Sequence, residues 1–369
     1  MNKLSIGWFI SPHGYGHAAR SCAIMDALSE QQPEIQFEIF TTIPEHFFSS
    51  ALQAQYRYHS AQTDIGFVQQ SPTVLDLGKT LGQLNDFMPF SPERVDQLAT
   101  TLTQSKCQAV ICDIAPIGIT VAQQLGIPSL LIANFTWDWI YQSLTTEKPE
   151  FKPIISQFET LFAAATHTVF TEPHCHQPEQ TELLAAPVAR KHRETAEQVK
   201  ASLGITDELP VVLVTMGGMS DHYPFIKKME QQSRALFILT GTSESKRQGN
   251  LIQSSNNTPL YLPDIVYLSD LVVAKLGYSI IAETYHADVP MLYVPRKLLR
   301  ESPVLESYVE KQLAATKLPE DEFYRGDWIE QISQYIQPTT QGSKSITKEN
   351  GADQIATFVL SKLTTTQSE

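Results

Sequence analysis

A turn rich in glycine and histidine near the start of the chain is the first place where the sequence could do chemistry. An apolar segment over 4–11 runs directly into Pro12-His13-Gly14-Tyr15-Gly16-His17-Ala18-Ala19-Arg20. A glycine turn between a buried strand and a helix presents backbone N–H groups and a helix N-terminus, which attract anions. His17 lies where the helix would begin, and a positioned imidazole is the commonest general base near neutral pH. The alternatives are that His17 caps the helix or contacts a bound phosphate.

The same turn fits a loose dinucleotide-binding fingerprint, G-x-G-x-x-A, through Gly14, Gly16 and Ala19. That fingerprint also needs an acid at the end of the second strand to bind the ribose. In the predicted second strand, over 37–41, Glu38 lies inside the strand and the end is Phe40-Thr41. The dinucleotide interpretation therefore loses its main support.

Asp113 is a candidate partner for His17. It follows the apolar run 109–112, and the carboxyl ends of parallel strands meet at one edge of a sheet. A carboxylate bonded to one imidazole nitrogen fixes the tautomer and supports the charged ring. We therefore predict that the two residues form a base and its orienting acid. The alternative is that Asp113 caps the helix that follows its strand.

A second strand-to-helix turn, over 270–283, carries the most informative pattern. The strand ends at Lys275, a turn follows at Gly277, and the new helix presents Ser279 and then Glu283. The helix N-terminus favours phosphate. A carboxylate one turn deeper is suited to accept hydrogen bonds from both ribose hydroxyls, so the pattern indicates a nucleoside diphosphate. The alternative is a surface pair between Lys275 and Glu283.

A further glycine turn follows the predicted strand 211–215. It contains Gly217, Gly218 and Met219, and it would come from the first strand of the second domain. We expect it to provide a second group of backbone N–H donors for the diphosphate.

The elements that hold these turns form two series of short apolar strands separated by helical patterns, which indicates parallel sheets covered on both faces. With 369 residues, we predict two Rossmann-like, doubly wound α/β domains with a cleft between them, over 1–190 and 200–340, and a terminal helix within 345–365. The interdomain linker would lie in 172–204, and 64–92 would be a strand-poor excursion that covers a ligand. The predicted strands are 4–11, 37–41, 109–112, 129–133 and 167–171, then 211–215, 235–240, 258–262, 271–275 and 290–294.

The charge, the apolar runs and the cysteines of the chain argue against several classes of function. The formal charge is −13, so the surface should repel nucleic acid and anionic lipid. We find no apolar run that could span a bilayer and no signal peptide. The four cysteines form no CxxC and indicate reduced thiols and a cytoplasmic protein. His174, Cys175 and His176 have no second ligand cluster, so we predict no metal site.

These motifs resemble those of the UDP-glycosyltransferase superfamily, whose two Rossmann-like domains form the GT-B fold. Lys275, Gly277, Tyr278 and Glu283 occupy the His, Gly, Trp and Glu positions of its donor signature, with the lysine as a substitute cation. Ile280 stands where that signature has a serine hydroxyl, so phosphate coordination should differ. Nearly the whole chain also resembles the glycosyltransferase-like N-terminal region of L-arabinokinases. The shared segments are His13–Arg20, Asn134–Tyr141, Lys275–Tyr278, Pro295-Arg296 and Glu301-Ser302-Pro303.

The resemblance implies a nucleotide-sugar donor, with UDP favoured, and a small-molecule or glycan acceptor. It implies that His17 deprotonates the acceptor, that Asp113 orients it, and that the terminal helix crosses back to the first domain. It places His13, Gly14, Gly16, Arg20, Trp137 and Asp138 on the phosphate or acceptor side. Donor contacts would come from Gly217, Gly218, Met219, Lys275, Gly277, Tyr278, Ser279, Glu283, Arg296, Glu301 and Ser302.

The reaction that these expectations favour is an inverting glycosyl transfer without a metal or other cofactor, because helix dipoles with Lys275 or Arg296 would offset the charge of the leaving diphosphate. Retaining transfer, a nucleotide-sugar 2-epimerase of the same fold, an inactive nucleotide-sugar sensor and a dinucleotide oxidoreductase also stay open. For Trp137 and its aromatic neighbours, core packing is the competing interpretation.

Overall fold

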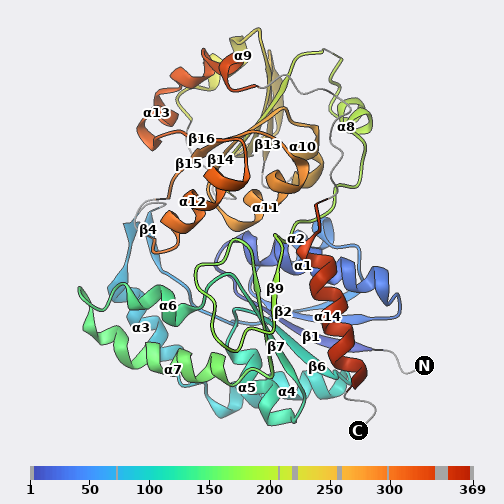
Figure 1. Ribbon diagram of the computed structural model, residues 1–369, viewed down its shortest axis with the longest axis vertical. Coiled ribbons are helices and arrows are strands. Elements are labelled where there is room, and N and C mark those ends of the chain that lie inside the picture. The colour runs from blue at the N-terminus through green and yellow to red at the C-terminus, as the bar shows by residue number, and fades with distance from the viewer. Residues whose placement is uncertain are drawn as a thin grey trace. The chain divides into compact units, whose positions relative to one another are not determined.

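The computed structural model describes residues 4–71, 74–206, 208–217, 223–255, 260–296, 299–336 and 348–365. The chain divides into two compact units, each built around a seven-stranded sheet (Figure 1). Unit 1 takes the chain up to Ala189, together with Leu299–Glu301 and the C-terminal helix. Unit 2 takes the chain from Arg190 onward, apart from those two segments.

The sheet of unit 1 has the strand order β3-β2-β1-β6-β7-β8-β9, and every pair in it is parallel. Five of its strands lie where the apolar runs predicted them. The edge strands β3 and β9 were not predicted, because β3 is largely polar and half-exposed and β9 has three residues inside the expected linker. The bounds are β1 Ser5–Ile10, β2 Gln36–Thr41, β3 Tyr56–Ser60, β6 Ala109–Asp113, β7 Ser129–Ala133, β8 His167–Thr171 and β9 Leu183–Ala185.

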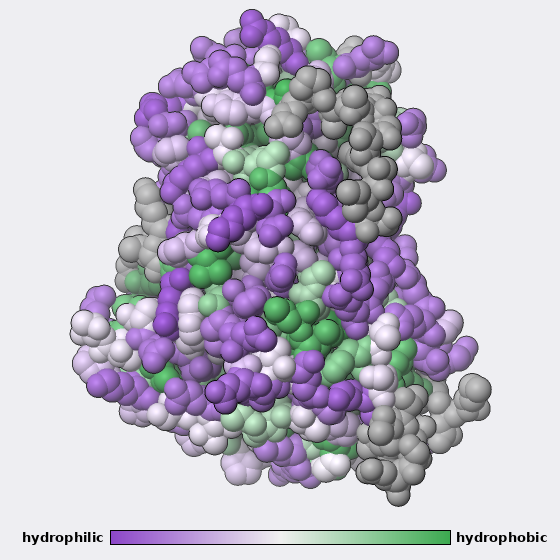
Figure 2. Space-filling model, in the orientation of Figure 1, coloured by the Kyte–Doolittle hydropathy of each residue, from purple (hydrophilic) through white to green (hydrophobic). Residues whose placement is uncertain are grey.

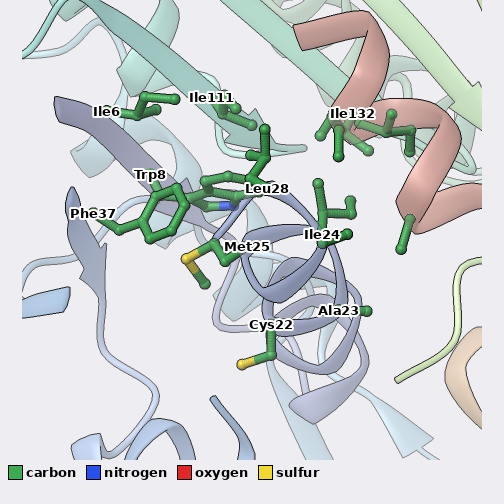
Figure 3. Packing of buried hydrophobic residues seen from close by; sticks show 14 of the residues in the cluster. Ile6, Trp8, Cys22, Ala23, Ile24, Met25, Leu28, Phe37, Ile111 and Ile132 are labelled. Atoms are coloured by element: carbon green, nitrogen blue, oxygen red, sulfur yellow. The ribbon is translucent and has the colours of Figure 1, made fainter. Parts of the chain in front are cut away.

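Helices cover both faces of this sheet because its strands are apolar on both sides. Trp8 points into a cluster with α1 and α14, and its ring meets that of Phe37 edge-on at 5.6 Å (Figure 3). Gly7, one residue earlier, faces Leu102 of α4 on the other side. The helices are α1 Tyr15–Gln31, α2 Glu45–Ala51, α3 Leu77–Phe87, α4 Pro92–Gln104, α5 Ile117–Leu125, α6 Trp137–Gln142, α7 Lys152–Ala163 and α14 Gly351–Thr365, with a 3-10 turn η1 at Pro149–Phe151.

The C-terminal helix α14 packs beside α1 (Figure 1). The start of α14 is bonded to the residues that follow β9. The amide of Gly351 donates to Pro187 O at 3.2 Å, and the Asn350 side chain donates to Ala189 O at 2.8 Å. A Cβ at Gly351 would lie 2.0 Å from Ala186 O, so only glycine fits there.

The region 64–92 is more regular than the sequence suggested. It contains an antiparallel pair of short strands, β4 Gln69–Ser71 and β5 Val74–Leu75, followed by α3. Asp76 caps α3 by accepting the amide of Lys79 at 2.9 Å. The buried residues Thr80, Leu84 and Phe87 recur at helical spacing, a signal that the glycines of this region obscured.

The sheet of unit 2 has the order β12-β13-β11-β10-β14-β15-β16 and is parallel except for β12. The strand predicted over 258–262 is wrong. Leu262 instead begins helix α10, in which Pro263 occupies the first turn. The strand that the sequence analysis missed is β13, whose polar residues Gln253, Ser254 and Ser255 are buried. Residues 258 and 259 lie outside the described part. The strands are β10 Val211–Thr215, β11 Leu236–Thr242, β12 Lys246–Gln248, β13 Leu251–Ser255, β14 Leu271–Lys275, β15 Met291–Val294 and β16 Ala315–Lys317.

Alternate residues of these strands enter two separate apolar clusters, one on each face of the sheet. The helices of unit 2 are α8 Ala196–Ser202, α9 Ile226–Gln231, α10 Leu262–Leu268, α11 Tyr278–Ala287, α12 Ser302–Gln312 and α13 Glu320–Arg325, with 3-10 turns η2 Asp327–Ile329 and η3 Ile332–Gln334. The predicted linker 172–204 is thus largely structured, because it contributes β9 to unit 1 and α8 to unit 2.

Hydrophilic residues cover most of the face drawn in Figure 2, with smaller hydrophobic areas between them. None of the helices in the described ranges combines the length and the apolar character that crossing a bilayer would require.

Candidate functional site

The glycine turn of unit 1 connects β1 to α1. Gly14 has a φ of 81°, a left-handed conformation that favours glycine, and its amide donates to Pro12 O at 2.8 Å. Helix α1 then begins at Tyr15 without a side-chain cap. His17 therefore lies in the first turn of α1, and its side chain points inward, since only 7% of the residue is exposed.

His17 and Asp113 form the predicted hydrogen-bonded pair, with 2.8 Å between Nδ1 and Oδ1. Asp113 is fully buried at the end of β6, opposite Ile10 of β1 in the sheet register. The chain turns directly after it through Ile114, whose φ of 44° is unusual for a β-branched residue. Helix α5 begins only at Ile117 and has no side-chain cap, so the helix-capping alternative for Asp113 is wrong.

Asp113 is ionised because several hydrogen-bond donors contact its carboxylate. Burial alone would raise the pKa of this carboxyl, but the charge and hydrogen bonds of Arg20, with those of His17, lower it to about 2. Ser21 Oγ donates to Oδ2 at 3.1 Å and itself accepts from Trp8 Nε1 at 3.0 Å. A carboxylate can only accept, so Nδ1 of neutral His17 carries the hydrogen and Nε2 carries the lone pair. This tautomer leaves Nε2 able to accept a proton.

Arg20 and Asn134 belong to the same network. The Arg20 guanidinium is buried and bonds both Asp113 and the side-chain oxygen of Asn134. Sequence reasoning placed Arg20 on the phosphate or acceptor side; the structure buries it against Asp113 and Asn134, with Nη2 3.3 Å from His17 Nδ1. Asn134 was noted only as part of a shared segment, and nothing in its local sequence indicates that it anchors an arginine 114 positions away.

Asp64 is a second buried acid beside the turn that the sequence analysis missed. Its Oδ2 accepts from Ser11 Oγ at 2.7 Å and from Trp137 Nε1, and its Oδ1 accepts the amide of Ile65 at 2.8 Å. Burial raises its pKa to about 6, although these donors and nearby His17 oppose the rise. Asp64 follows no predicted strand, so no spacing rule pointed to it.

In the aromatic cluster after β7, Trp137 and Tyr141 are core, as the competing interpretation held, whereas Trp139 is half-buried. Trp137 and Tyr141 are buried and stacked at 5.4 Å, and Trp137 meets His13 edge-on at the same centroid distance. His13 is half-buried against Gly66, where an added Cβ would lie 2.5 Å from its Nδ1. Asp138 is also half-buried, and its Oδ1 is enclosed without a hydrogen bond from the described residues. Burial raises the pKa of Asp138.

The second strand-to-helix turn lies in unit 2, between β14 and α11. An added Cβ at Gly277 would meet nothing within 4 Å, so there is open space beside the N-terminus of α11. Lys275, Tyr278 and Ser279 are half-buried around this turn. The arrangement fits an anion-binding helix N-terminus.

Glu283 is more enclosed than the sequence predicted. Its Oε1 accepts from Arg190 twice, from Nε at 2.9 Å and from Nη2 at 2.8 Å. Its Oε2 is buried, and no described residue bonds it. Burial raises the pKa of Glu283 while the charge of Arg190 lowers it. Arg190 thus occupies Oε1, one of the two oxygens that the predicted ribose contact would use, and the burial of Glu283 excludes the surface pair considered for it.

The other predicted donor residues differ in their exposure and in the unit to which they belong. Gly217 is exposed with a φ of 73°, whereas Gly218 and Met219 lie outside the described residues. Arg296 is half-buried. Glu301 is buried and groups with unit 1, while its neighbour Ser302 begins α12 of unit 2.

The surroundings of Glu38 and His176 bear on the dinucleotide and metal interpretations. Glu38, the only acid in the second strand, is fully buried and bonded by Arg57 and His59 of β3, so it does not serve a dinucleotide ribose. His176 stacks on Trp139 at 5.5 Å, and burial lowers its pKa to about 4. Within the described ranges, no three His, Cys, Asp or Glu side chains gather as metal ligands would.

Comparison with known proteins identifies the family. Residues 5–322 match the family model described as glycosyl transferase family 1. The chain belongs to this family. This glycosyl transferase is also similar to the L-arabinokinase of Arabidopsis thaliana, with 24% identity over 341 residues that cover 90% of the chain and 32% of the relative. It thus spans about a third of the length of that curated relative.

Solved structures agree on the fold. The calicheamicin glycosyltransferase CalG4 aligns with this glycosyl transferase at a TM-score of 0.64 and 13% identity, covering 98% of this chain and 99% of the other. UGT71G1 of Medicago truncatula, solved with UDP-glucose, aligns at a TM-score of 0.60 and 12% identity, covering 98% of both chains. The predicted GT-B fold and glycosyltransferase class are confirmed, as is the resemblance to L-arabinokinase.

Proposed function

We propose that the protein transfers a sugar from a UDP-sugar to an acceptor hydroxyl with inversion at the anomeric carbon and without a metal ion. The observation that carries the proposal is the buried His17–Asp113 pair, with the imidazole hydrogen on Nδ1. A base that removes the acceptor proton directly suits a single displacement, whereas an epimerase needs no base for an acceptor. The cytoplasmic location inferred from the cysteines stays a prediction.

In the proposed reaction, Nε2 of His17 takes the proton of the acceptor hydroxyl as its oxygen attacks the anomeric carbon. The bond from that carbon to the diphosphate oxygen breaks, and UDP leaves with the electron pair. Asp113 remains a carboxylate and stabilises the imidazolium through Nδ1. The protonated ring then releases its proton to solvent.

Unit 2 would hold the donor. The N-terminus of α11, with open space at Gly277, supports diphosphate binding, and Glu283 Oε2 would accept a hydrogen bond from a ribose hydroxyl. Lys275 and Arg296 would offset the growing charge of the leaving group, which is why we propose that no divalent cation is required. Uridine is chosen because the similar Medicago truncatula enzyme was solved with UDP-glucose and a similar anthocyanidin 3-O-glucosyltransferase with UDP.

Unit 1 would hold the acceptor, a small molecule or a glycan, near His13 and Asp138. Trp137 would support these residues without contacting the acceptor, because its indole is buried and bonded to Asp64. The unpartnered Oδ1 of Asp138 is a candidate acceptor of a substrate hydroxyl.

The variant His17→Ala tests the proposal. We expect sugar transfer to fall by about 100-fold or more, the size of a general-base contribution, while UDP binding, measured by thermal shift, stays within twofold. His59→Ala, which also breaks a pair between a histidine and a buried acid in unit 1, is the control and should retain transfer. If His17→Ala lost UDP binding together with transfer, His17 would be a phosphate contact and the proposal would fail.

A further inference from the structure

Arg20 lies on the same face of α1 as His17, one turn further along the helix. It is 6% exposed, which is rare for an arginine and requires that its donors have partners inside the protein. The role of Arg20 therefore follows from the groups inside the protein that its donors bond.

Every branch of the Arg20 guanidinium has a partner in unit 1. Nε donates to Asp113 Oδ2 at 2.9 Å, Nη2 donates to Asp113 Oδ1, and Nη1 donates to Asn134 Oδ1. Two parallel bonds to one carboxylate fix both its position and its rotation about Cβ–Cγ. The orientation of Asp113 is thus set by Arg20 as well as by its own strand.

Asn134 fixes the far side of the guanidinium. Its amide nitrogen donates to Thr171 O at 2.8 Å, to Thr171 Oγ1 at 2.7 Å and to Pro173 O at 3.0 Å, so the side-chain oxygen faces Arg20. The network therefore runs from α1 across the ends of three neighbouring strands, β6, β7 and β8. Asp113 and Asn134 therefore fix the guanidinium of Arg20 from two sides.

Arg20 also constrains the tautomer of His17. Its Nη2 lies 3.3 Å from His17 Nδ1, and a guanidinium can only donate. If Nδ1 of His17 carried the lone pair, it would accept a hydrogen bond from Arg20, and its hydrogen bond to the Asp113 carboxylate would be lost. Because Arg20 holds Asp113 ionised and Oδ1 lies 2.8 Å from Nδ1, the hydrogen is kept on Nδ1.

We propose that Arg20 is a positioning residue for the transfer reaction, which holds Asp113 in the orientation that keeps the hydrogen of neutral His17 on Nδ1 and the lone pair on Nε2. This inference rests on the proposed role of His17 as the base. It replaces the expectation that Arg20 contacts the phosphate or the acceptor. Lysine cannot substitute, because an ammonium provides no planar fork for the carboxylate.

The test compares Arg20→Lys with the wild-type protein, both labelled with ¹⁵N at histidine and checked for folding by circular dichroism. Long-range ¹H–¹⁵N correlation spectra report which ring nitrogen carries hydrogen, and His17→Gln assigns the signal among the ten histidines. We expect His17 of the wild type at pH 8 to be hydrogenated on Nδ1 alone, and Arg20→Lys to show a mixture of tautomers. If Arg20→Lys does not fold, Arg20→Gln takes its place.

A rate measurement accompanies the spectra. Release of UDP from a panel of UDP-hexoses, with water as the acceptor, should fall by about 100-fold in Arg20→Lys, the order of loss caused by a small misplacement of a catalytic group. Arg57→Lys is the matched control, because Arg57 also pairs with a buried acid, Glu38, in the sheet of unit 1. It should leave both the tautomer and the rate unchanged.

Two results would overturn the inference. One is an Arg20→Lys protein in which His17 keeps its single tautomer. The other is a loss of UDP affinity in Arg20→Lys at an unchanged tautomer, which would make Arg20 a phosphate contact. The proposed function fails separately, if His17→Ala releases UDP as fast as the wild type; the tautomer spectra would still decide the role of Arg20.

Discussion

Asp64 and Asp113 are both buried beside the glycine turn of unit 1, but their pKa values move in opposite directions. Asp113 has a guanidinium partner, and its pKa falls to about 2. The donors that bond Asp64 are neutral, namely Ser11, Trp137 and a backbone amide, so burial dominates and its pKa rises to about 6. Because Arg20 is a permanent cation beside Asp113, Asp113 rather than Asp64 is the carboxylate that supports the imidazolium of His17.

This difference predicts how Asp64 affects stability. A folded-state pKa above the ordinary 3.8 means that the stability supplied by the proton is complete below pH 3.8 and is lost as the pH rises through about 6. The loss amounts to about 3 kcal/mol. Asp64→Asn keeps a similar shape and stays neutral, so its free energy of unfolding relative to wild type should increase between pH 4 and pH 8. Denaturant unfolding at both pH values checks this, and a constant difference would contradict it.

At the scale of elements, apolar runs predicted the central strands well, because a strand buried on both faces leaves a continuous signature. They failed for β3 at the edge and for β13, where buried polar residues such as Gln253 and Ser254 imitate a loop. Strand-end geometry also predicted the pairing of Asp113 with His17. The contacts of Arg20 and Asp64 could not be predicted, because their partners Asn134 and Trp137 lie 114 and 73 positions away.

The start of α14 leaves no room for a side chain at position 351. A Cβ at Gly351 would lie 2.0 Å from the backbone oxygen of Ala186, which is not a flexible side chain and cannot move aside cheaply. We expect Gly351→Ala to destabilise unit 1 by about 1–3 kcal/mol, the usual cost of overpacking. Gly82→Ala, inside α3 and with nothing within 4 Å, is the control and should stabilise by about 0.5–1 kcal/mol. Equal melting temperatures for the two variants would refute the expectation.

At the scale of the whole molecule, the two units share a sheet architecture but differ in the chemistry beside their glycine turns. An added Cβ would meet nothing within 4 Å at either Gly14 or Gly277. Unit 1 pairs an imidazole with a carboxylate beside its turn, whereas α11 of unit 2 carries Glu283, paired with Arg190. This asymmetry suits a base in unit 1 and an anion in unit 2. It predicts that nucleotide binding depends on unit 2 alone.

Thermal unfolding with UDP, GDP, TDP, CDP and NAD tests that division. A ligand at 100 times its dissociation constant stabilises the folded state by about 2.7 kcal/mol, so UDP should raise the melting temperature by several degrees and the other four by much less. Glu283→Gln removes the charge that would hold the ribose and should weaken UDP binding by about tenfold or more, the value of a hydrogen bond to a charged group. Glu38→Gln changes an equally buried acid of unit 1 and should bind UDP as the wild type does. A shift with NAD in place of UDP, or unchanged UDP binding by Glu283→Gln, would show that the nucleotide does not bind in unit 2 as proposed.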